Sequence, residues 1–348
     1  MNPIPAPDFS HIRRMSDGRG TFEHALYAAP RPEHGYCTDD MARLLVVATR
    51  QADTDGTADL AHLSLSFVAD AQSPDGACRN RMDRHGAWED QPALEDAWGR
   101  SVWALGSAAG HSGIDDIART ALDRLVAPIR RRSPWPRAMA FAALGAAELL
   151  SMHPAHAEAR ALLADAADAM ALGPVGPVGS AGPVGQPGWP WPEPRLTYAN
   201  AVLPEAMIAA GAALDRPLLL RHGLDLLAWL VTHETKGGHL SPTPVGGAGP
   251  GDVGPNFDQQ PIEVAALADA CARASRLDDN PLWGHGVAAA LGWFLGDNDA
   301  EAVMWDPLTG GSFDGLQPTG VNRNQGTEST LALLSTLQHA RRLVAVSS

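Results

Sequence analysis

Cysteine is scarce in this sequence, and the few cysteines lie far apart. Cys37, Cys78 and Cys271 are the three that occur in 348 residues, and they form no CxxC pair. This spacing argues against a disulfide framework and against a structural zinc site. The sequence also lacks a G-x-S-x-G elbow, a P-loop, an H-E-x-x-H motif and a dinucleotide-binding fingerprint. We therefore expect neither a metal ion nor an organic cofactor.

Runs of basic residues and long apolar runs are also missing. The chain has 26 Lys and Arg against 40 Asp and Glu, which gives a formal net charge of −14. This balance argues against a nucleic-acid partner and against binding to an anionic membrane. No apolar run approaches the roughly 20 residues that span a bilayer, and the first residues show no signal-peptide pattern. A cytoplasmic protein is therefore expected.

Strand-like alternation is rare, whereas segments rich in Ala and Leu recur between clusters of Gly, Pro, Asp and Ser. This pattern predicts an all-α protein with about eleven helices, and one further short helix near residues 21–27. The predicted helices cover residues 39–51, 58–71, 95–109, 114–129, 134–150, 155–171, 197–211, 216–232, 260–275, 281–295 and 326–344.

Six of these predicted helices follow long loops, and the others follow short turns. The six begin near residues 39, 95, 134, 197, 260 and 326. Six helical hairpins whose long Gly/Pro-rich loops share one mouth predict an (α/α)6 toroid. A solenoid would show a fixed repeat period, and the six starts are unequally spaced. We expect a single catalytic domain over residues 1–348, with a flexible Gly/Pro insertion at residues 173–188.

Two adjacent acids, Asp39 and Asp40, open the first of these helices, shortly after His34 and Tyr36. Acids in a first helical turn stabilise the helix dipole, which is the ordinary explanation of one such pair. The same arrangement returns, however, at residues 95–96, 258–263 and 324–328. Because a toroid would bring these helix starts to one mouth, the recurrence predicts a ring of polar side chains there.

Glycoside cleavage needs two carboxyl groups, one protonated to assist the leaving group and one ionised to activate water or attack the sugar. The candidate catalytic residues are Asp40, Asp96, Glu263 and Glu328. Asp96 could instead form an i,i+4 ion pair with Arg100, and Glu263 could complete a capping box. Aromatic rings, amides and arginine also suit sugar recognition, and the candidate substrate-binding residues are His34, Tyr36, Asp39, Glu95, Trp98, Arg100, Trp191, Tyr198, Asn200, Asp258, Gln259, Gln260, Asn322, Asn324 and Gln325.

Five motifs stand at or near the predicted helix starts: HGYCTDD at 34–40, EDxxGRxxWALG at 95–106, LTYxN at 196–200, FDQQPIE at 257–263 and NQGxES at 324–329. Together they resemble a bacterial protein family that is described as glycosyltransferase-associated and is similar in fold to the six-hairpin glycosidases. The resemblance spans residues 8–345 and implies an (α/α)6 toroid that acts on carbohydrate with inversion. Met41, Trp98 and Ala199 depart from the pattern, which has Asn, His and an acid there. These departures imply an altered substrate or weakened activity.

The leading hypothesis is a glycoside hydrolase that acts on an oligosaccharide. In it, Asp40 and Asp96 contribute to the ionised side of the site, and Glu263 or Glu328 is the other carboxyl group. A first alternative is a sugar 2-epimerase-like isomerase, which would need histidine acid–base pairs and for which His34 is the best candidate. A second alternative is a non-catalytic carbohydrate-binding partner of a glycosyltransferase, which would tolerate the loss of an acid at Ala199.

Overall fold

The computed structural model describes residues 4–51, 56–111, 114–171, 188–252 and 254–347. This part of the chain contains twelve α-helices, so the predicted all-α class is confirmed for it. The helices are α1 (Ser10–Met15), α2 (Thr38–Arg50), α3 (Ala58–Ala71), α4 (Asp96–His111), α5 (Asp115–Leu125), α6 (Pro136–Met152), α7 (Ala157–Ala171), α8 (Val202–Ala213), α9 (Pro217–His233), α10 (Pro261–Ala274), α11 (Pro281–Phe294) and α12 (Thr327–Ser347).

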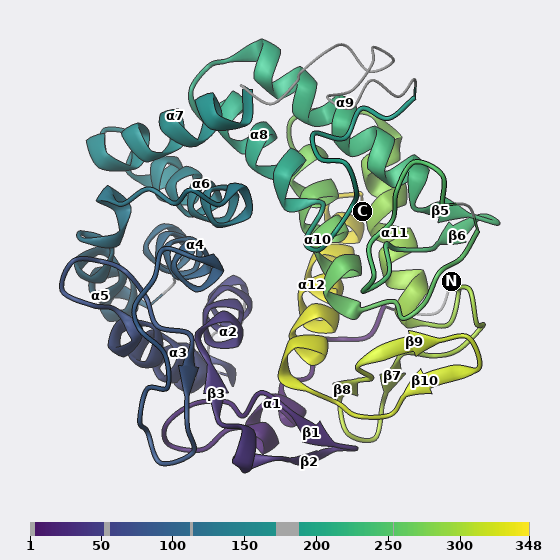
Figure 1. Ribbon diagram of the computed structural model, residues 1–348, viewed down its shortest axis with the longest axis horizontal. Coiled ribbons are helices and arrows are strands. Elements are labelled where there is room, and N and C mark those ends of the chain that lie inside the picture. The colour runs from purple at the N-terminus through teal and green to yellow at the C-terminus, as the bar shows by residue number, and fades with distance from the viewer. Residues whose placement is uncertain (1–3, 52–55, 112–113, 172–187, 253, 348) are drawn as a thin grey trace.

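The even-numbered helices contact one another in a closed cycle. Each packs on the next from α2 through α4, α6, α8 and α10 to α12, and α12 packs back on α2 (Figure 1). A small cavity of about 40 Å³ inside the cycle is lined by all six helices, through side chains that include Val47, Trp103, Phe141, Val202, Ala265 and Leu331. Helices α3, α5, α7, α9 and α11 each pack on the outside of the helix that precedes them.

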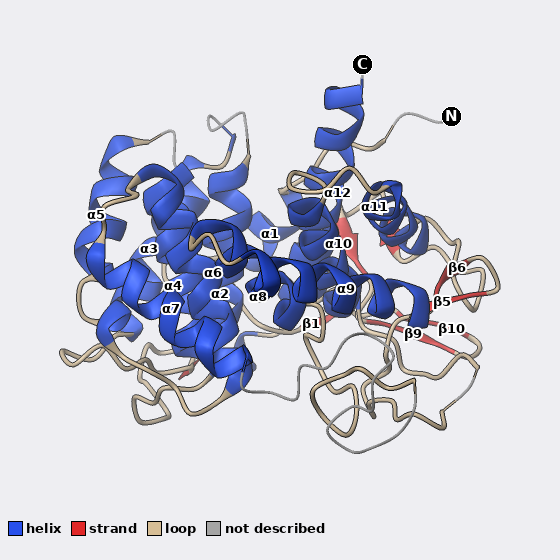
Figure 2. Ribbon diagram, turned by 90° about the horizontal axis from the view of Figure 1, so that it is seen from above, coloured by secondary structure: helices blue, strands red, loops and turns tan. Residues whose placement is uncertain are grey.

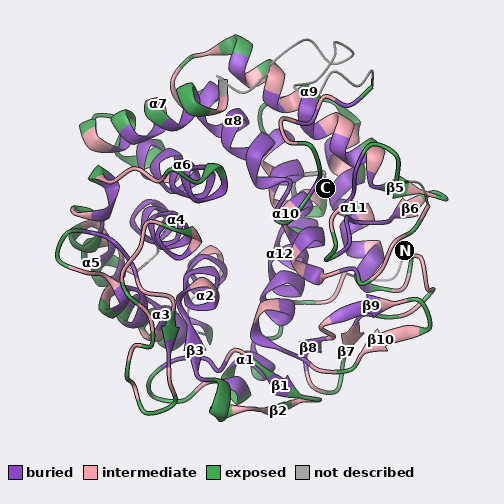
Figure 3. Ribbon diagram, in the orientation of Figure 1, coloured by how far each residue is buried: buried purple, intermediate pink, exposed green. Residues whose placement is uncertain are grey.

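Burial follows this arrangement. The helices of the cycle are buried along most of their length, whereas the outer helices expose one face to solvent (Figure 3). Most long loops lie at one end of the helices, and the C-terminal end of α12 projects from the other (Figure 2). Within the described residues, every helix is too short or too polar to span a membrane.

Glycines allow α4 and α6 to pack closely. A Cβ atom at Gly106 would lie 2.1 Å from the carbonyl oxygen of Gly145, and one at Gly145 would lie 2.2 Å from that of Val102. Backbone atoms cannot move aside as a flexible side chain can, so only glycine fits at these positions.

Replacing Gly106 with Ala is therefore expected to reduce the free energy of unfolding by about 1–3 kcal/mol, the usual effect of overpacking. Gly284 in α11 is the matched control, because a Cβ there would meet nothing within 4 Å. Gly284→Ala should instead stabilise the protein by up to about 1 kcal/mol through helix propensity. Urea denaturation of both variants measures the two changes, and equal effects would contradict this account of the α4–α6 contact.

Ten short strands form five two-stranded antiparallel sheets in the connections between the helices of the described residues. The pairs are β1 (Ala25–Leu26) with β2 (Ala29–Pro30), β3 (Tyr36–Cys37) with β4 (Arg81–Met82), β5 (Thr235–Lys236) with β6 (His239–Leu240), β7 (Trp305–Asp306) with β8 (Gly311–Ser312), and β9 (Gly315–Gln317) with β10 (Gly320–Asn322). The prediction of a short helix near residues 21–27 is wrong. Strand β1 lies there, and the short helix of this region, α1, ends earlier at Met15.

The largest error in a predicted helix start concerns α8, which begins at Val202 and not near residue 197. Ala199 adopts a positive φ of 45°, so residues 197–201 form a turn that no regular helix accommodates. The predicted Gly/Pro insertion at 173–188 lies outside the described residues, except for Gly188.

Candidate active site

A cavity of about 330 Å³ opens where α2, α10 and α12 begin. Its walls combine carboxylates, amides and arginines from these helix starts, from the β9–β10 hairpin and from β4. The lining residues are Glu23, His24, Cys37, Asp39, Asp40, Arg43, Arg81, Val245, Asp258, Gln260, Asp314, Gly315, Asn322, Gly326, Glu328 and Ser329. Helix N-termini provide positive potential, which favours acids at this position.

Arg43 joins two of the predicted catalytic carboxylates. Its two terminal nitrogens contact Asp40 at 2.7 Å and Glu328 at 2.8 Å. The Arg43 and Asp40 side chains are 8% and 2% exposed, whereas that of Glu328 is 39% exposed. One acid of the pair is therefore removed from water, and the other faces the open cavity.

Burial raises the pKa of Asp40 to about 7, because the cost of removing its charge from water outweighs the attraction of Arg43. Arg43 contacts Oδ1 of this carboxyl group, and Oδ2 receives no hydrogen bond from a nitrogen or oxygen of the described residues. Asp40 can therefore hold a proton near neutral pH, on an oxygen that is itself buried.

Asp39 has a different environment from its neighbour. The Asn80 side chain donates a hydrogen bond to Asp39 Oδ2 at 3.1 Å, and the Asn80 side-chain oxygen accepts one from the backbone N–H of Asp39. Arg100 lies 3.3 Å from Asp39 Oδ1. Asp39 therefore ties the start of α2 to the loop before β4, and it also lines the cavity.

Asp314 provides another acid on the cavity wall. Its Oδ1 accepts a hydrogen bond from the backbone N–H of Gly326 at 2.7 Å, and burial raises its pKa. Glu23 also faces the cavity and forms an ion pair with Arg81. The predicted residues Asp258, Gln260 and Asn322 complete this wall, so their position agrees with a role in substrate binding.

Asp96, Glu95 and Tyr198 lie in a separate cleft of about 560 Å³, which is also lined by Trp135, Pro136, Arg137 and Glu193. This cleft covers the starts of α4 and α6 and the loop before α8. Asp96 lies 3.7 Å from Arg100, as the i,i+4 spacing predicted. The four predicted catalytic carboxylates therefore do not share one cavity, since only Asp40 and Glu328 meet.

Glu263 is engaged with the protein backbone. Its carboxylate oxygens accept hydrogen bonds from the backbone N–H groups of Ala199 at 2.5 Å and Asn200 at 3.3 Å, and burial raises its pKa. The side-chain oxygen of Asn200 in turn accepts a bond from the N–H of Thr197. Glu263 and Asn200 therefore hold the turn before α8, and neither lines the cavity or the cleft.

Three of the predicted aromatic ligands are buried. Trp98 donates its indole N–H to the carbonyl of Pro128, Trp191 donates to Glu193, and the Tyr36 hydroxyl donates to Asp17. All three side chains are at most 1% exposed. Their interpretation as substrate contacts is therefore corrected, because they have no surface left for a sugar ring.

The remaining predicted ligands also lie outside the cavity lining. The Gln259 amide donates a hydrogen bond to Asp299 and accepts one from the indole N–H of Trp293. The Gln325 amide accepts one from the Thr309 hydroxyl and donates one to Asp306. Both amides therefore already have partners within the protein. The side-chain oxygen of Asn324 accepts a hydrogen bond from the backbone N–H of Tyr27. His34 is exposed and packs edge-on against His24, with ring centroids 5.0 Å apart.

Sequence reasoning missed several cavity residues: Glu23, His24, Arg43, Arg81 and Asp314. Arg43 follows Asp40 by three residues, and this spacing is a signal that could have identified it. The others come from loops and from the short strand β4, whose positions depend on contacts with distant segments, so no local pattern marks them.

No protein-family model matches the sequence, and a comparison with curated proteins finds no match. Solved structures do share the fold. A sugar epimerase from a ruminal bacterium has a TM-score of 0.70 at 12% identity, over 96% of this chain and 95% of that one. Cellobiose 2-epimerase from Spirochaeta thermophila has a TM-score of 0.66 at 13% identity, over 97% and 93%. An inactive variant of the α-1,6-mannanase GH76A from Salegentibacter sp., in complex with α-1,6-mannotetrose, has a TM-score of 0.62 at 11% identity, over 96% of both chains.

Proposed function

We propose that this chain is a carbohydrate-active enzyme, a glycoside hydrolase that cleaves an oligosaccharide with inversion of configuration. In this proposal the whole chain is one domain, an (α/α)6 toroid with its site at the mouth that the long loops surround. The closed cycle of six helices supports the architecture. Epimerases and a mannanase share the fold, which supports a carbohydrate substrate.

One observation carries the choice of reaction: Asp40 and Glu328 bind the same guanidinium from two sides and both line the cavity. A guanidinium is only a few bond lengths wide, so the two carboxyl groups lie within the upper limit of about 9.5 Å for glycosidase pairs. Their environments differ, since Asp40 is buried with a raised pKa and Glu328 is partly exposed. Different environments assign different roles to two acids.

In the proposed mechanism, protonated Asp40 is the general acid. It transfers its proton to the glycosidic oxygen as the bond between that oxygen and the anomeric carbon breaks. Glu328, whose carboxylate contacts Arg43, is the general base and removes a proton from the water that attacks the anomeric carbon from the opposite face. The proton moves from water to Glu328, and the leaving sugar keeps the proton from Asp40. This role for Asp40 replaces its predicted place on the ionised side.

The pKa of Asp40 leads to a specific pH dependence. A general acid must carry its proton. The titration of Asp40 should therefore leave kcat/KM unchanged below pH 7 and lower it above pH 7. The expected fall is about tenfold per pH unit beyond a midpoint near 7. A pH profile with a neutral oligosaccharide measures it, and a rate that stays level up to pH 9 would refute Asp40 as the acid.

A second candidate function, sugar epimerisation, is favoured by His24. This histidine lines the cavity, and the His34 ring packs edge-on against it from outside the lining. Epimerisation at C2 requires acid–base groups that remove and return a proton, and histidine suits that role.

One assay separates the two reactions. A panel of neutral oligosaccharides that includes cellobiose and α-1,6-mannotetrose is incubated with the protein in deuterated water, and the products are analysed by mass spectrometry and NMR. Hydrolysis gives new reducing ends without deuterium at C2. Epimerisation incorporates deuterium at C2 and leaves the linkage intact, and this result would overturn the hydrolase proposal.

A further inference from the structure

The cleft beside the cavity presents two exposed aromatic side chains. Trp135 is 56% exposed and Tyr198 is 48% exposed, and both line the cleft of about 560 Å³. Trp283 and Trp293, by contrast, are almost completely buried. Apolar rings together with a few convergent polar groups are typical of a small-molecule site.

The local backbone holds Trp135 in place before any ligand arrives. Pro134 and Pro136 flank it and restrict its backbone. Its N–H donates to the Ser133 hydroxyl at 3.0 Å, and its carbonyl accepts the N–H of Met139 at 3.0 Å. A fixed backbone at Trp135 reduces the conformational entropy that is lost when a ligand binds there.

The polar groups of the cleft are also fixed. Arg137 donates to both carboxylate oxygens of Glu193, at 2.7 and 2.8 Å, and its guanidinium lies 4.8 Å from the Tyr198 ring centroid. Trp191 contributes a further hydrogen bond to Glu193. These side chains present hydrogen-bonding atoms at defined positions beside the exposed rings.

Arg100 connects the cleft with the cavity. It lies 3.3 Å from Asp39 on the cavity wall and 3.7 Å from Asp96 on the cleft wall. The two hollows are therefore separated by little more than one guanidinium and its two carboxylates.

We propose that the cleft is a second sugar-binding subsite, in which one ring of the substrate stacks on Trp135 and hydrogen-bonds to Asp96 and the Arg137–Glu193 pair. The proposal rests on the carbohydrate function proposed above and adds that the substrate spans both hollows. Glu95, Asp96 and Glu193 give three carboxylates against two arginines, Arg137 in the lining and Arg100 beside Asp96, so one negative charge remains in excess, and like charges repel. The subsite therefore takes a neutral sugar and not a uronic acid.

The test compares Trp135→Ala with wild-type protein on neutral glucose- and mannose-based oligosaccharides of increasing length. For the longer members, kcat/KM should fall about tenfold, the equivalent of 1.4 kcal/mol, while the value for the shortest cleaved member should stay the same. Trp135→Phe keeps an aromatic ring and should retain most of the activity. Leu218→Ala is the matched control, because Leu218 is 73% exposed and lies in α9, outside both linings.

Equal losses for all chain lengths, or no loss in Trp135→Ala, would overturn the subsite while leaving the hydrolase proposal intact. Binding provides an independent measurement if no oligosaccharide is cleaved. Saturation-transfer NMR with the same oligosaccharides should then show weaker binding to Trp135→Ala than to wild type. That result would support the subsite although the hydrolase proposal had failed, and equal binding would overturn the subsite.

Discussion

Replacement of Glu328 by Gln is expected to reduce kcat for oligosaccharide cleavage by about 10²–10⁴-fold, the usual contribution of a general base. Gln keeps the size of the side chain but cannot accept the proton of the attacking water. KM should change little, because the change affects the transition state more than the bound substrate. Initial rates of reducing-end release over a range of substrate concentrations give both constants.

Two further variants make this result specific. Asp40→Asn removes the proposed acid and should lower the rate to a similar extent, with loss of the alkaline limb of the pH profile. Glu301→Gln is the control for a general effect of charge, because Glu301 is exposed and lines neither hollow. If Glu328→Gln retained wild-type activity, another carboxylate of the cavity would have to be the base.

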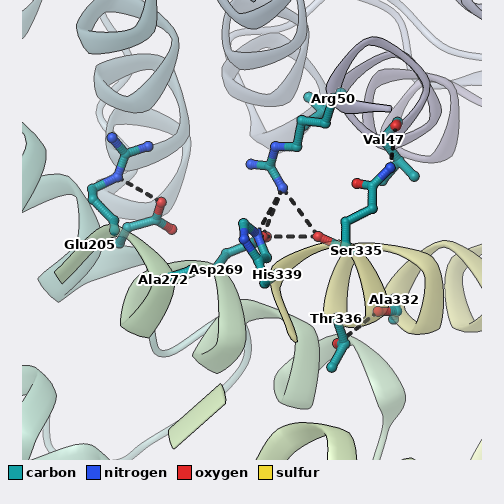
Figure 4. A network of polar contacts seen from close by, with 12 residues as sticks. Val47, Arg50, Glu205, Asp269, Ala272, Ala332, Ser335, Thr336 and His339 are labelled. Carbon is teal, nitrogen blue, oxygen red and sulfur yellow. Dashed lines mark hydrogen bonds and ion pairs between the residues drawn. The ribbon is translucent and has the colours of Figure 1, made fainter. Parts of the chain in front are cut away.

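The second large effect concerns stability and a buried polar cluster that lies outside the lining of the candidate active-site cavity. Asp269 of α10 accepts bonds from Arg50 at 2.8 Å and from Ser335 at 2.9 Å, and contacts His339 at 2.5 Å (Figure 4). The side chains of Arg50 and Asp269 are 13% and 11% exposed. These contacts link α2, α10 and α12, which close the helical cycle.

Asp269→Asn should reduce the free energy of unfolding by about 3–5 kcal/mol, because it leaves the buried guanidinium of Arg50 without its counter-ion. Asp168→Asn is the matched control. Asp168 pairs with Arg216 on the surface, where the side chains are 63% and 39% exposed, and such pairs contribute up to about 1 kcal/mol. Urea denaturation measures the free energy of unfolding of both variants.

If Asp269→Asn prevents folding, Ser335→Ala replaces it as the test variant, with an expected loss of about 1 kcal/mol. A loss in Asp269→Asn no greater than in the control, or no loss in Ser335→Ala, would contradict a structural role for the cluster.

The same cluster predicts sensitivity to acid. Burial lowers the pKa of His339, so the unfolded chain binds a proton there more readily than the folded chain as the pH falls below 6.5. For Asp269 burial acts in the opposite direction, but Arg50 and His339 together lower its pKa. Its contribution is complete above the pKa of 3.8 in the unfolded chain and declines at lower pH. Both groups therefore destabilise the protein in acid.

The sequence pattern predicted the helices well where local signals decide them. The predicted boundaries of residues 58–71 agree with those of α3, because an apolar periodic segment lies between turn residues. Prediction failed at α8, where the backbone of Ala199 is held by Glu263 from a helix more than sixty residues away in sequence. Such a contact depends on the tertiary fold and leaves no periodic signal.

The candidate site shows the same limit. The pair Asp39–Asp40 and Glu328 were recognisable as acids at helix starts, and the structure brings Asp40 and Glu328 to one arginine. Trp98 and Trp191 looked equally suitable for sugar binding, yet their burial depends on packing that composition does not specify. Trp135, the exposed tryptophan that lines the cleft, was not among the predicted ligands.

The stereochemistry of cleavage tests the central claim most directly. Proton NMR spectra recorded during the first minutes of oligosaccharide hydrolysis reveal the anomer of the new reducing end before mutarotation. The pairing of Asp40 and Glu328 as acid and base predicts the anomer opposite to that of the cleaved linkage. The retained anomer would contradict this pairing, and binding without any cleavage would contradict the hydrolase itself.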